Sequence, residues 1–322
     1  MLDQASPPFH EDHQLSNGRM RESEHSQAVT VTRPAGDSIP LIISSPHSGR
    51  QYTPEFMAQV RLPLDVLRSG EDFHVDTLMA SAPRYGVTVL SATFPRVMCD
   101  ANRASLDLDP AMIMDAEQQT LRPTVKGLAG LGSIPGVVSG GRQLYASKLS
   151  MAETTSRLRR YWHPYHATLQ ALIDEKKAEH GFCVLLDMHS MPPGVDGSKA
   201  DCVIGDRFGS SSQLEYVQAL ARSLLAENLS VARNHPFAGG FITSFYGRPD
   251  EGVSAIQLEL NRALYVSRRA GGCNGINPRF GEKMDKVIAA FAAFVRDQMK
   301  MRASERVNHD PESGGKVDIS GI

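Results

Sequence analysis

Two histidines occupy comparable places after two apolar segments of the sequence. His47 follows the strand-like segment 41–45, His189 follows the segment 183–188, and a serine comes directly after each histidine. In α/β sheets, ligands bind at the carboxyl ends of the strands. Each histidine could simply cap its own strand. The acidic residues elsewhere in the chain favour a shared metal site, to which the two imidazoles contribute as ligands.

Acidic residues can complete such a site. Catalytic zinc commonly takes two histidines and one carboxylate and keeps a position for water. Glu71 and Asp72 are the candidate carboxylates, although both also suit a helix start, where acidic side chains cap the helix and favour its dipole. Glu259 lies in the otherwise apolar segment 253–260, where an unpaired carboxylate is costly. We expect it to be a general base, or else the partner of a cation such as Arg262.

Asn102 and Arg103 form a polar pair just after a short strand-like segment at 96–99. A guanidinium group can bind a substrate carboxylate through two parallel hydrogen bonds. The alternative is an ordinary surface ion pair with one of three nearby aspartates, Asp100, Asp107 and Asp109.

The composition excludes several classes of protein. The 322 residues are 41% hydrophobic and 22% charged, and the net charge of −2 gives no basic surface for nucleic acid. No apolar run approaches the roughly 20 residues of a membrane span, and the first residues do not resemble a signal peptide. The four cysteines are widely spaced, which is typical of a reducing compartment. We expect a cytoplasmic protein that acts on a small molecule, without a nucleic-acid or membrane partner. The sequence does not determine its oligomeric state.

Strand-like and helix-like segments alternate along the chain. Strands are expected at 28–32, 39–45, 86–91, 96–99, 182–188, 200–205, 230–232 and 253–260. Helices are expected from Thr53 onward, from about the acidic pair 71–72 to residue 79, over 148–180 as one long helix or a helical pair, and at 211–227 and 283–301. This alternation predicts an α/β fold with a mostly parallel sheet covered on both faces.

The two ends of the chain and one internal loop differ in composition from the rest of the sequence. Residues 1–27 and 304–322 are polar, and we expect a disordered arm and a frayed tail on either side of a single domain at 28–303. Residues 125–141 are rich in glycine, but their spacing is not that of a dinucleotide-binding loop. A mobile lid over the site fits this segment better.

Six segments occur in the order typical of the N-formylglutamate amidohydrolase family, which the chain resembles from about residue 38 to about residue 300. They are SPHSG at 45–49, DFHVD at 72–76, DANR at 100–103, DMHS at 187–190, NHPFAGG at 234–240 and QLELNR at 257–262. The resemblance implies a phosphorylase/hydrolase-like three-layer α/β sandwich, related to zinc carboxypeptidases and aspartoacylase. It also implies metal-dependent hydrolysis of N-formyl-L-glutamate to formate and L-glutamate, in many bacteria the last step of a histidine degradation route.

The resemblance also implies roles for particular residues. His47, Asp72 and His189 match the ligands of Zn²⁺, or of another divalent ion such as Co²⁺ or Mn²⁺, with Glu71 as the alternative acidic ligand. In zinc carboxypeptidases a glutamate follows the first histidine by three residues. Arg50 stands at that place here, so the acidic ligand must come from elsewhere in the chain, and the segment 71–72 offers the candidates.

Further roles concern the base and the substrate. Glu259 matches the catalytic glutamate that passes a proton from water to the departing amine. Asn102 and Arg103 resemble the pair with which zinc carboxypeptidases hold a substrate carboxylate. Arg142 and Arg248 are candidates for the second carboxylate or the oxyanion.

Three other functions stay open at this point. One is an amidohydrolase that acts on another N-acyl amino acid or on a peptide. A second is a non-catalytic module that binds acidic ligands on the same fold. The third, a serine hydrolase using Ser48 or Ser190, is disfavoured because the chain has no G-x-S-x-G motif.

Overall fold

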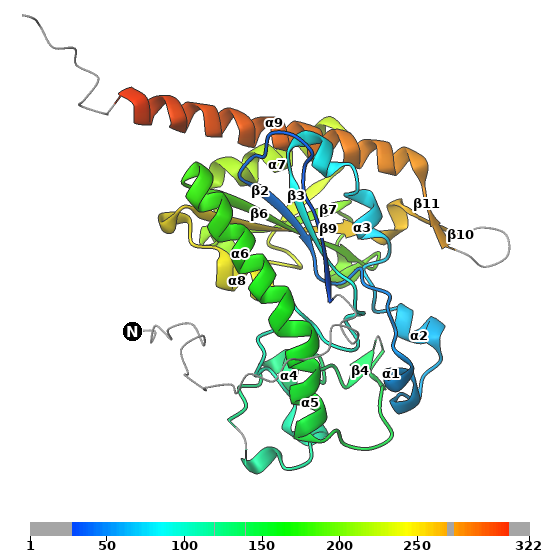
Figure 1. The fold of residues 1–322 in the computed structure, drawn as a ribbon. Coiled ribbons are helices and arrows are strands. Elements are labelled where there is room, and N and C mark those ends of the chain that lie inside the picture. The colour runs from blue at the N-terminus through cyan, green and yellow to red at the C-terminus, as the bar shows by residue number, and fades with distance from the viewer. Residues whose placement is uncertain (1–27, 119, 139, 269–273, 309–322) are drawn as a thin grey trace, which may run out of the picture.

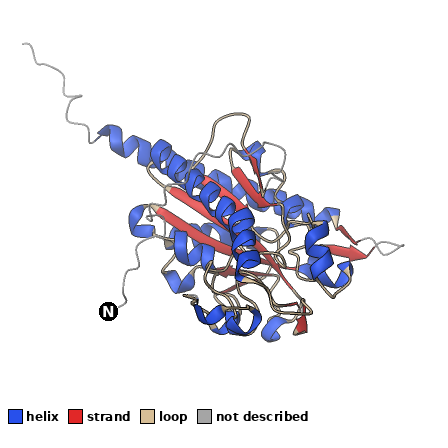
Figure 2. Cartoon of the chain, turned by 60° about the horizontal axis from the view of Figure 1, so that its bottom comes forward, coloured by secondary structure: helices blue, strands red, loops and turns tan. Residues whose placement is uncertain are grey.

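A seven-stranded sheet passes through the protein with helices on both of its faces (Figures 1 and 2). The structure is a computed structural model that describes residues 28–118, 120–138, 140–268 and 274–308. The arm expected at 1–27 lies outside the described residues.

The sheet is mixed and mostly parallel, as the sequence predicts. Its strands are β1 (Val29–Thr32), β2 (Leu41–Ser45), β3 (Thr88–Ala92), β6 (Cys183–Met191), β7 (Cys202–Gly205), β8 (Val231–Arg233) and β9 (Val253–Asn261), in the order β1-β3-β2-β6-β9-β7-β8. The four central strands β3, β2, β6 and β9 pair in parallel. Strand β1 is antiparallel to β3 at one edge, and β7 is antiparallel to β9.

The two faces of the sheet pack on two separate sets of helices. The helices α3 (Val75–Leu78), α7 (Leu214–Ala226) and α9 (Pro278–Asn308) cover one face, while α6 (His163–His180) and α8 (Phe241–Tyr246) cover the other. Leu41 and Ile43 of β2 enter the first core, and Ile42 enters the second. Because successive strand residues point to opposite faces, a strand buried on both sides must be apolar throughout. The predicted three-layer sandwich is therefore confirmed.

Shorter elements form a second region on the α6 side, seen below the sheet in Figure 1. They are α1 (Pro54–Gln59), α2 (Leu64–Arg68), α4 (Val125–Leu128), β4 (Val137–Val138), β5 (Arg142–Gln143) and α5 (Met151–Arg157). A π-helical segment, Leu158–Trp162, joins α5 to α6, so one long helical rod connects this region to the sheet. A small hairpin of β10 (Val266–Arg268) and β11 (Asn274–Ile276) precedes α9.

Two predictions about local structure are wrong. The segment 96–99 forms a turn instead of a strand, because Val97, Met98 and Cys99 all pack into the α6-side core. The closing helix continues to Asn308, so residues 304–308 are helical and do not belong to a frayed tail. Residues 309–322 lie outside the described part of the chain.

The described residues include three of the four cysteines and all the long helices that could be tested as membrane spans. Cys99, Cys183 and Cys202 are free and buried, while Cys273 lies outside the described ranges. Among the helices that the structure describes, none combines the length and apolar character needed to cross a bilayer.

Candidate active site

The carboxyl ends of three neighbouring strands meet at one cavity of about 270 Å³. His47 follows the end of β2, His189 lies near the end of β6, and Glu259 lies near the end of β9. In the register of β6 with β9, His189 stands beside Glu259, and Asp187 stands beside Gln257. Because residues two apart on a strand share a face, these side chains project together. The two histidines, which the sequence predicts to converge at the strand exits, lie together at this cavity.

His47, Asp72 and His189 form a buried cluster. Their potential ligand atoms all lie within 4.8 Å of one another. Asp72 Oδ2 is 2.9 Å from His189 Nδ1 and 3.4 Å from His47 Nδ1. The other oxygen, Asp72 Oδ1, accepts hydrogen bonds from Ser190 Oγ at 3.2 Å and Arg262 Nη2 at 3.1 Å. One oxygen of this carboxylate is thus anchored, and the other faces the two imidazoles.

The turn between α2 and α3 brings Asp72, and not Glu71, to the histidines. The Asp72 N–H donates a 2.9 Å hydrogen bond to the His47 carbonyl, which fixes the turn against the exit of β2. The Glu71 carboxylate accepts instead from the Tyr52 hydroxyl at 2.9 Å and lies beside Arg68. The two acidic residues therefore point to different surroundings, and only Asp72 reaches the cluster.

Each histidine of the cluster is also held by a second carboxylate. His47 Nε2 lies 2.7 Å from Asp100 Oδ1, and His189 Nε2 lies 2.8 Å from Asp187 Oδ2. In both rings the remaining nitrogen, Nδ1, faces Asp72. Carboxylates in this position fix the orientation of an imidazole and increase its basicity as a ligand.

The charges of the cluster compensate one another. Burial alone would raise the pKa of Asp72, but His189 and His47 hold it well below its usual range. Burial alone would lower the pKa of His189, yet Asp187 and Asp72 raise it well above the ordinary value. The carboxylates thus create a place that favours positive charge.

Glu259 is a buried carboxyl group with a strongly shifted pKa. Burial raises this pKa to about 7; the Asp72 charge adds to the rise, while His189 opposes it. Gln257 Nε2 donates to Glu259 Oε1 at 3.0 Å, and Gln257 Oε1 accepts from the Gly240 N–H at 2.9 Å. Arg262 contacts Asp72 and not Glu259, so the expected alternative of a structural Glu259–Arg262 pair is absent from the described contacts.

Asn102 and Arg103 also line the cavity. Asn102 Nδ2 lies 3.1 Å from His189 Nε2, while Asn102 Oδ1 accepts from the Ile242 N–H at 2.8 Å. None of the described ion pairs joins Arg103 to the three neighbouring aspartates considered as alternative partners. Asp100 instead pairs with Arg96 at 2.8 Å.

The long helical rod positions the backbone of this pair. Trp162 Nε1 donates to the Arg103 carbonyl at 2.8 Å, and His166 Nε2 donates to the Ala101 carbonyl at 2.9 Å. Burial lowers the pKa of His166 to about 4, so the ring is neutral and can keep this role near neutral pH. The segment that carries Arg103 is therefore fixed at two of its carbonyl groups by the same rod.

The structure does not bring Arg142 and Arg248 to the cavity. Arg142 is exposed in β5, part of a short hairpin in the second region. The Arg248 guanidinium stacks over Phe245 and lies 3.7 Å from Glu251. The cavity wall instead contains Arg96, Lys126 and Arg262. Sequence reasoning did not assign these three to the substrate; Arg262 was within the QLELNR segment, and Lys126 was within the glycine-rich loop.

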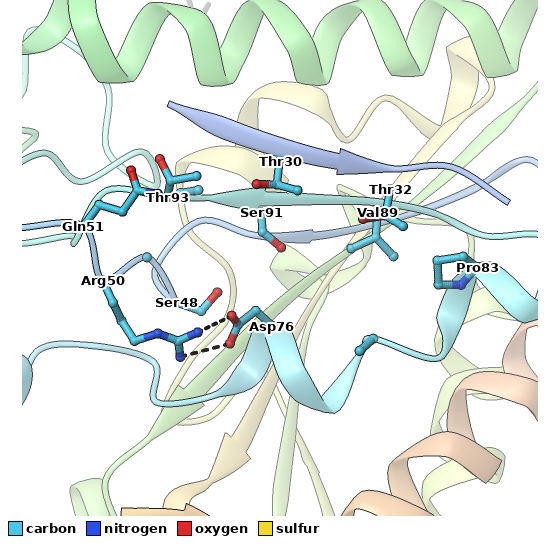
Figure 3. Close-up of a pocket in the computed structure, with 13 residues that line it drawn as sticks. Thr30, Thr32, Ser48, Arg50, Gln51, Asp76, Pro83, Val89, Ser91 and Thr93 are labelled. Carbon is cyan, nitrogen blue, oxygen red and sulfur yellow. Dashed lines mark hydrogen bonds and ion pairs between the residues drawn. The ribbon is translucent and has the colours of Figure 1, made fainter. Parts of the chain in front are cut away.

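Arg50 points into a different hollow of about 410 Å³ beside the edge of the sheet (Figure 3). Its Nη2 lies 2.6 Å from Asp76 Oδ2 on α3. This geometry agrees with the expectation that residue 50 does not supply the acidic group. The Ser48 hydroxyl bonds to Ser45 at 2.7 Å, and Ser190 contacts Asp72 and Arg262. None of the hydrogen bonds described for these two serines involves a histidine.

The fold and this site define a hydrolytic enzyme of the α/β class. Residues 39–266 match the family model of the N-formylglutamate amidohydrolases, and the chain belongs to this family. The resemblance found in the sequence is thereby confirmed.

Individual relatives agree with this assignment. The N-formylglutamate deformylase of Pseudomonas aeruginosa is 32% identical over 239 residues, which cover 72% of this chain and 84% of that protein. The N-formylglutamate deformylase of Pseudomonas putida is 28% identical over 246 residues, or 71% and 82% of the two chains. The crystal structure of N-formylglutamate amidohydrolase from Ralstonia eutropha JMP134 has a TM-score of 0.79 and 34% identity, and covers 84% of this chain and 99% of that one.

Proposed function

We propose that this protein hydrolyses N-formyl-L-glutamate to formate and L-glutamate. The observation that carries the proposal is the arrangement of Glu259, a buried group with a pKa of about 7, at the cavity that contains His47, Asp72 and His189. A carboxyl group with such a pKa can accept and return a proton near neutral pH. The names of the relatives supply the substrate.

The donor set fits a divalent metal ion. His47 Nδ1 is buried without a hydrogen-bond partner, and it faces the Asp72 oxygen that also meets His189 Nδ1. We assign these three residues as the ligands, with Asp100 and Asp187 orienting the imidazoles. Two nitrogens and one carboxylate oxygen suit Zn²⁺, and also Co²⁺ or Mn²⁺. When bound, such an ion supplies Lewis-acid activation of water and of the formyl carbonyl.

The protein's own residues perform the proton transfers in this proposal. Glu259 accepts a proton from the water that attacks the formyl carbon, and then returns it to the amine nitrogen as the C–N bond breaks. The hydrogen bond from Gln257 occupies one oxygen of Glu259, which leaves the other for the water. Arg103 binds one carboxylate of the substrate, and Asn102 keeps its segment next to His189.

Formate release is the direct test of the substrate. The metal-loaded protein is expected to release formate from N-formyl-L-glutamate, and to hydrolyse N-acetyl- and N-succinyl-L-glutamate much more slowly. Faster turnover of either other compound would move the proposal to a different N-acyl amino acid. An absence of turnover throughout this panel, with metal bound, would favour the non-catalytic binding module.

The activity is expected to fall as the solution becomes acidic. Glu259 must be unprotonated to accept a proton, and its pKa is raised to about 7. A bound cation nearby would lower this pKa, so the acidic limb of kcat/KM should lie between about pH 5 and pH 7, with about tenfold lower activity per pH unit beneath it. The measurement is kcat/KM between about pH 5 and pH 9. A flat profile over this range would argue against Glu259 as the base.

A further inference from the structure

Four cationic side chains line the cavity in the described part of the chain, and two of them are already neutralised by the protein. The four are Arg96, Arg103, Lys126 and Arg262. Arg96 lies 2.8 Å from Asp100, and Arg262 lies 3.1 Å from Asp72. None of the ion pairs found among the described residues involves the other two, Arg103 and Lys126. The cavity therefore has two cations available for a ligand.

Lys126 stands at the rim of the cavity beside other cations. Partial burial lowers its pKa, and the neighbouring Arg103 and Arg96 lower it further. Asp100 and Glu259 act in the opposite direction on this pKa, and Asp100 compensates the Arg96 charge. Lys126 and Arg103 have no ion-pair partner among the described residues, so an anion that binds to them would relieve their mutual repulsion. A structural role in an ion pair therefore does not explain why this lysine faces the cavity.

The local structure holds the backbone at Lys126 in place, and the side chain is exposed. The Asp107 carboxylate accepts from the Thr124 N–H at 2.7 Å and from its hydroxyl at 3.0 Å, and Thr124 Oγ1 caps the turn through the Gly127 N–H. The Lys126 carbonyl accepts from the Leu131 N–H at 2.9 Å. Residue 127 must be glycine, because an added Cβ would overlap the Asp107 carboxylate. The glycine-rich segment thus presents the lysine from a well-bonded turn; whether the segment closes as a lid stays a prediction.

We propose that Lys126 binds the side-chain carboxylate of the substrate, and that it makes the enzyme specific for N-acyl derivatives of dicarboxylic amino acids. This inference rests on the proposed function. N-formylglutamate has two carboxylates, and the cavity offers two cations without an ion-pair partner among the described residues. A neutral side chain in place of the γ-carboxylate would leave the Lys126 charge uncompensated, which penalises binding.

The position of each cation decides which carboxylate it binds. The α-carboxylate is attached to the carbon next to the scissile nitrogen, so it must stay close to the reacting centre. Arg103 follows Asn102, whose amide lies 3.1 Å from His189 Nε2, and is therefore assigned to the α-carboxylate. The γ-carboxylate lies farther along the side chain, toward the rim, where the long stem of Lys126 can reach it.

The test compares three substrates and four proteins. The substrates are N-formyl-L-glutamate, N-formyl-L-glutamine and the α-amide analogue of N-formylglutamate. The proteins are the wild type, Lys126→Met, Lys126→Arg and the control Lys148→Met, in which an exposed lysine outside the active-site cavity is replaced. The wild type should prefer glutamate over glutamine by about 10- to 100-fold in kcat/KM, the value of a hydrogen bond to a charged group.

In Lys126→Met, the kcat/KM for N-formyl-L-glutamate should exceed that for N-formyl-L-glutamine by no more than a few-fold. The preference of this variant for N-formyl-L-glutamate over the α-amide analogue should persist. Lys126→Arg should restore much of the glutamate preference, and Lys148→Met should keep all of it. An unchanged glutamate/glutamine ratio in Lys126→Met would overturn the inference, and a loss confined to the α-amide comparison would contradict the assignment of the two cations. If the wild type did not hydrolyse N-formylglutamate at all, the proposed function itself would fail.

A binding measurement makes the result independent of turnover. Glutarate carries two carboxylates and butyrate carries one, so the wild type should bind glutarate more tightly. In Lys126→Met this difference should disappear, as measured by calorimetry on protein whose melting temperature matches the wild type. A retained preference for glutarate would count against Lys126.

Discussion

Replacing Glu259 with glutamine is expected to lower kcat by about 10²- to 10⁴-fold while the protein stays folded and still binds metal. The amide of glutamine has nearly the same shape as the carboxylate but cannot accept a proton from water at any ordinary pH. The neighbouring Gln257 can donate to the new amide oxygen as it donates to Glu259 Oε1 at 3.0 Å. The side chain should therefore keep its place and lose only its proton chemistry.

The experiment needs a readout for each half of this expectation. Formate release measures turnover, and zinc content after dialysis measures the metal site. Glu251→Gln is a suitable control, because Glu251 is exposed and its nearest described ion-pair partner is Arg248, outside the cavity. Activity within tenfold of the wild type would remove Glu259 from the mechanism. Loss of both metal and activity would instead make it a part of the metal site.

Strand exits explain why much of the site could be predicted from the sequence. Apolar segments such as 183–188 identify buried strands, and in a parallel sheet the residues that follow such strands must converge at one edge. His47 and His189 were predicted in this way, and Glu259 from the cost of an unpaired carboxylate inside an apolar strand; the structure brings all three to one cavity. The family resemblance added Asp72, whose local sequence is also compatible with a simple helix cap.

Contacts between distant segments explain what the sequence could not predict. Asp100 holds the outer nitrogen of His47 from a segment 53 residues away, so this pairing leaves no mark in the spacing of residues. Asp187 holds His189 from two residues earlier on the same strand, a spacing that puts both side chains on one face. The cations illustrate the same limit. Arg142 is in a loop that appeared to be near the site, but it lies in an exposed hairpin, while Lys126 from the same loop lines the cavity.

Removing the metal is expected to abolish activity and to leave a folded protein. In the metal-free cluster, Asp72 is anchored by Ser190 and Arg262, and its other oxygen contacts the two histidines. These hydrogen bonds satisfy most of the buried polar atoms of the cluster even without a metal ion. A chelator should therefore inactivate the enzyme without unfolding it. Added Zn²⁺ should then restore formate release.

Thermal unfolding separates this expectation from a purely structural role of the metal. Because an ion that binds only the folded state stabilises it according to its concentration and affinity, Zn²⁺ should raise the melting temperature of the chelated protein. His189→Ala should lose both this rise and the restored activity, since it removes one of three ligands. His163→Ala is the matched control, because His163 begins α6 and lies outside the cluster.

Full activity after verified removal of metal would exclude the metal mechanism, whereas a rise in melting temperature without restored turnover would make the ion structural. The cluster favours the catalytic role: its donor atoms lie in the same cavity as Glu259, where a bound ion and the base could act on one water.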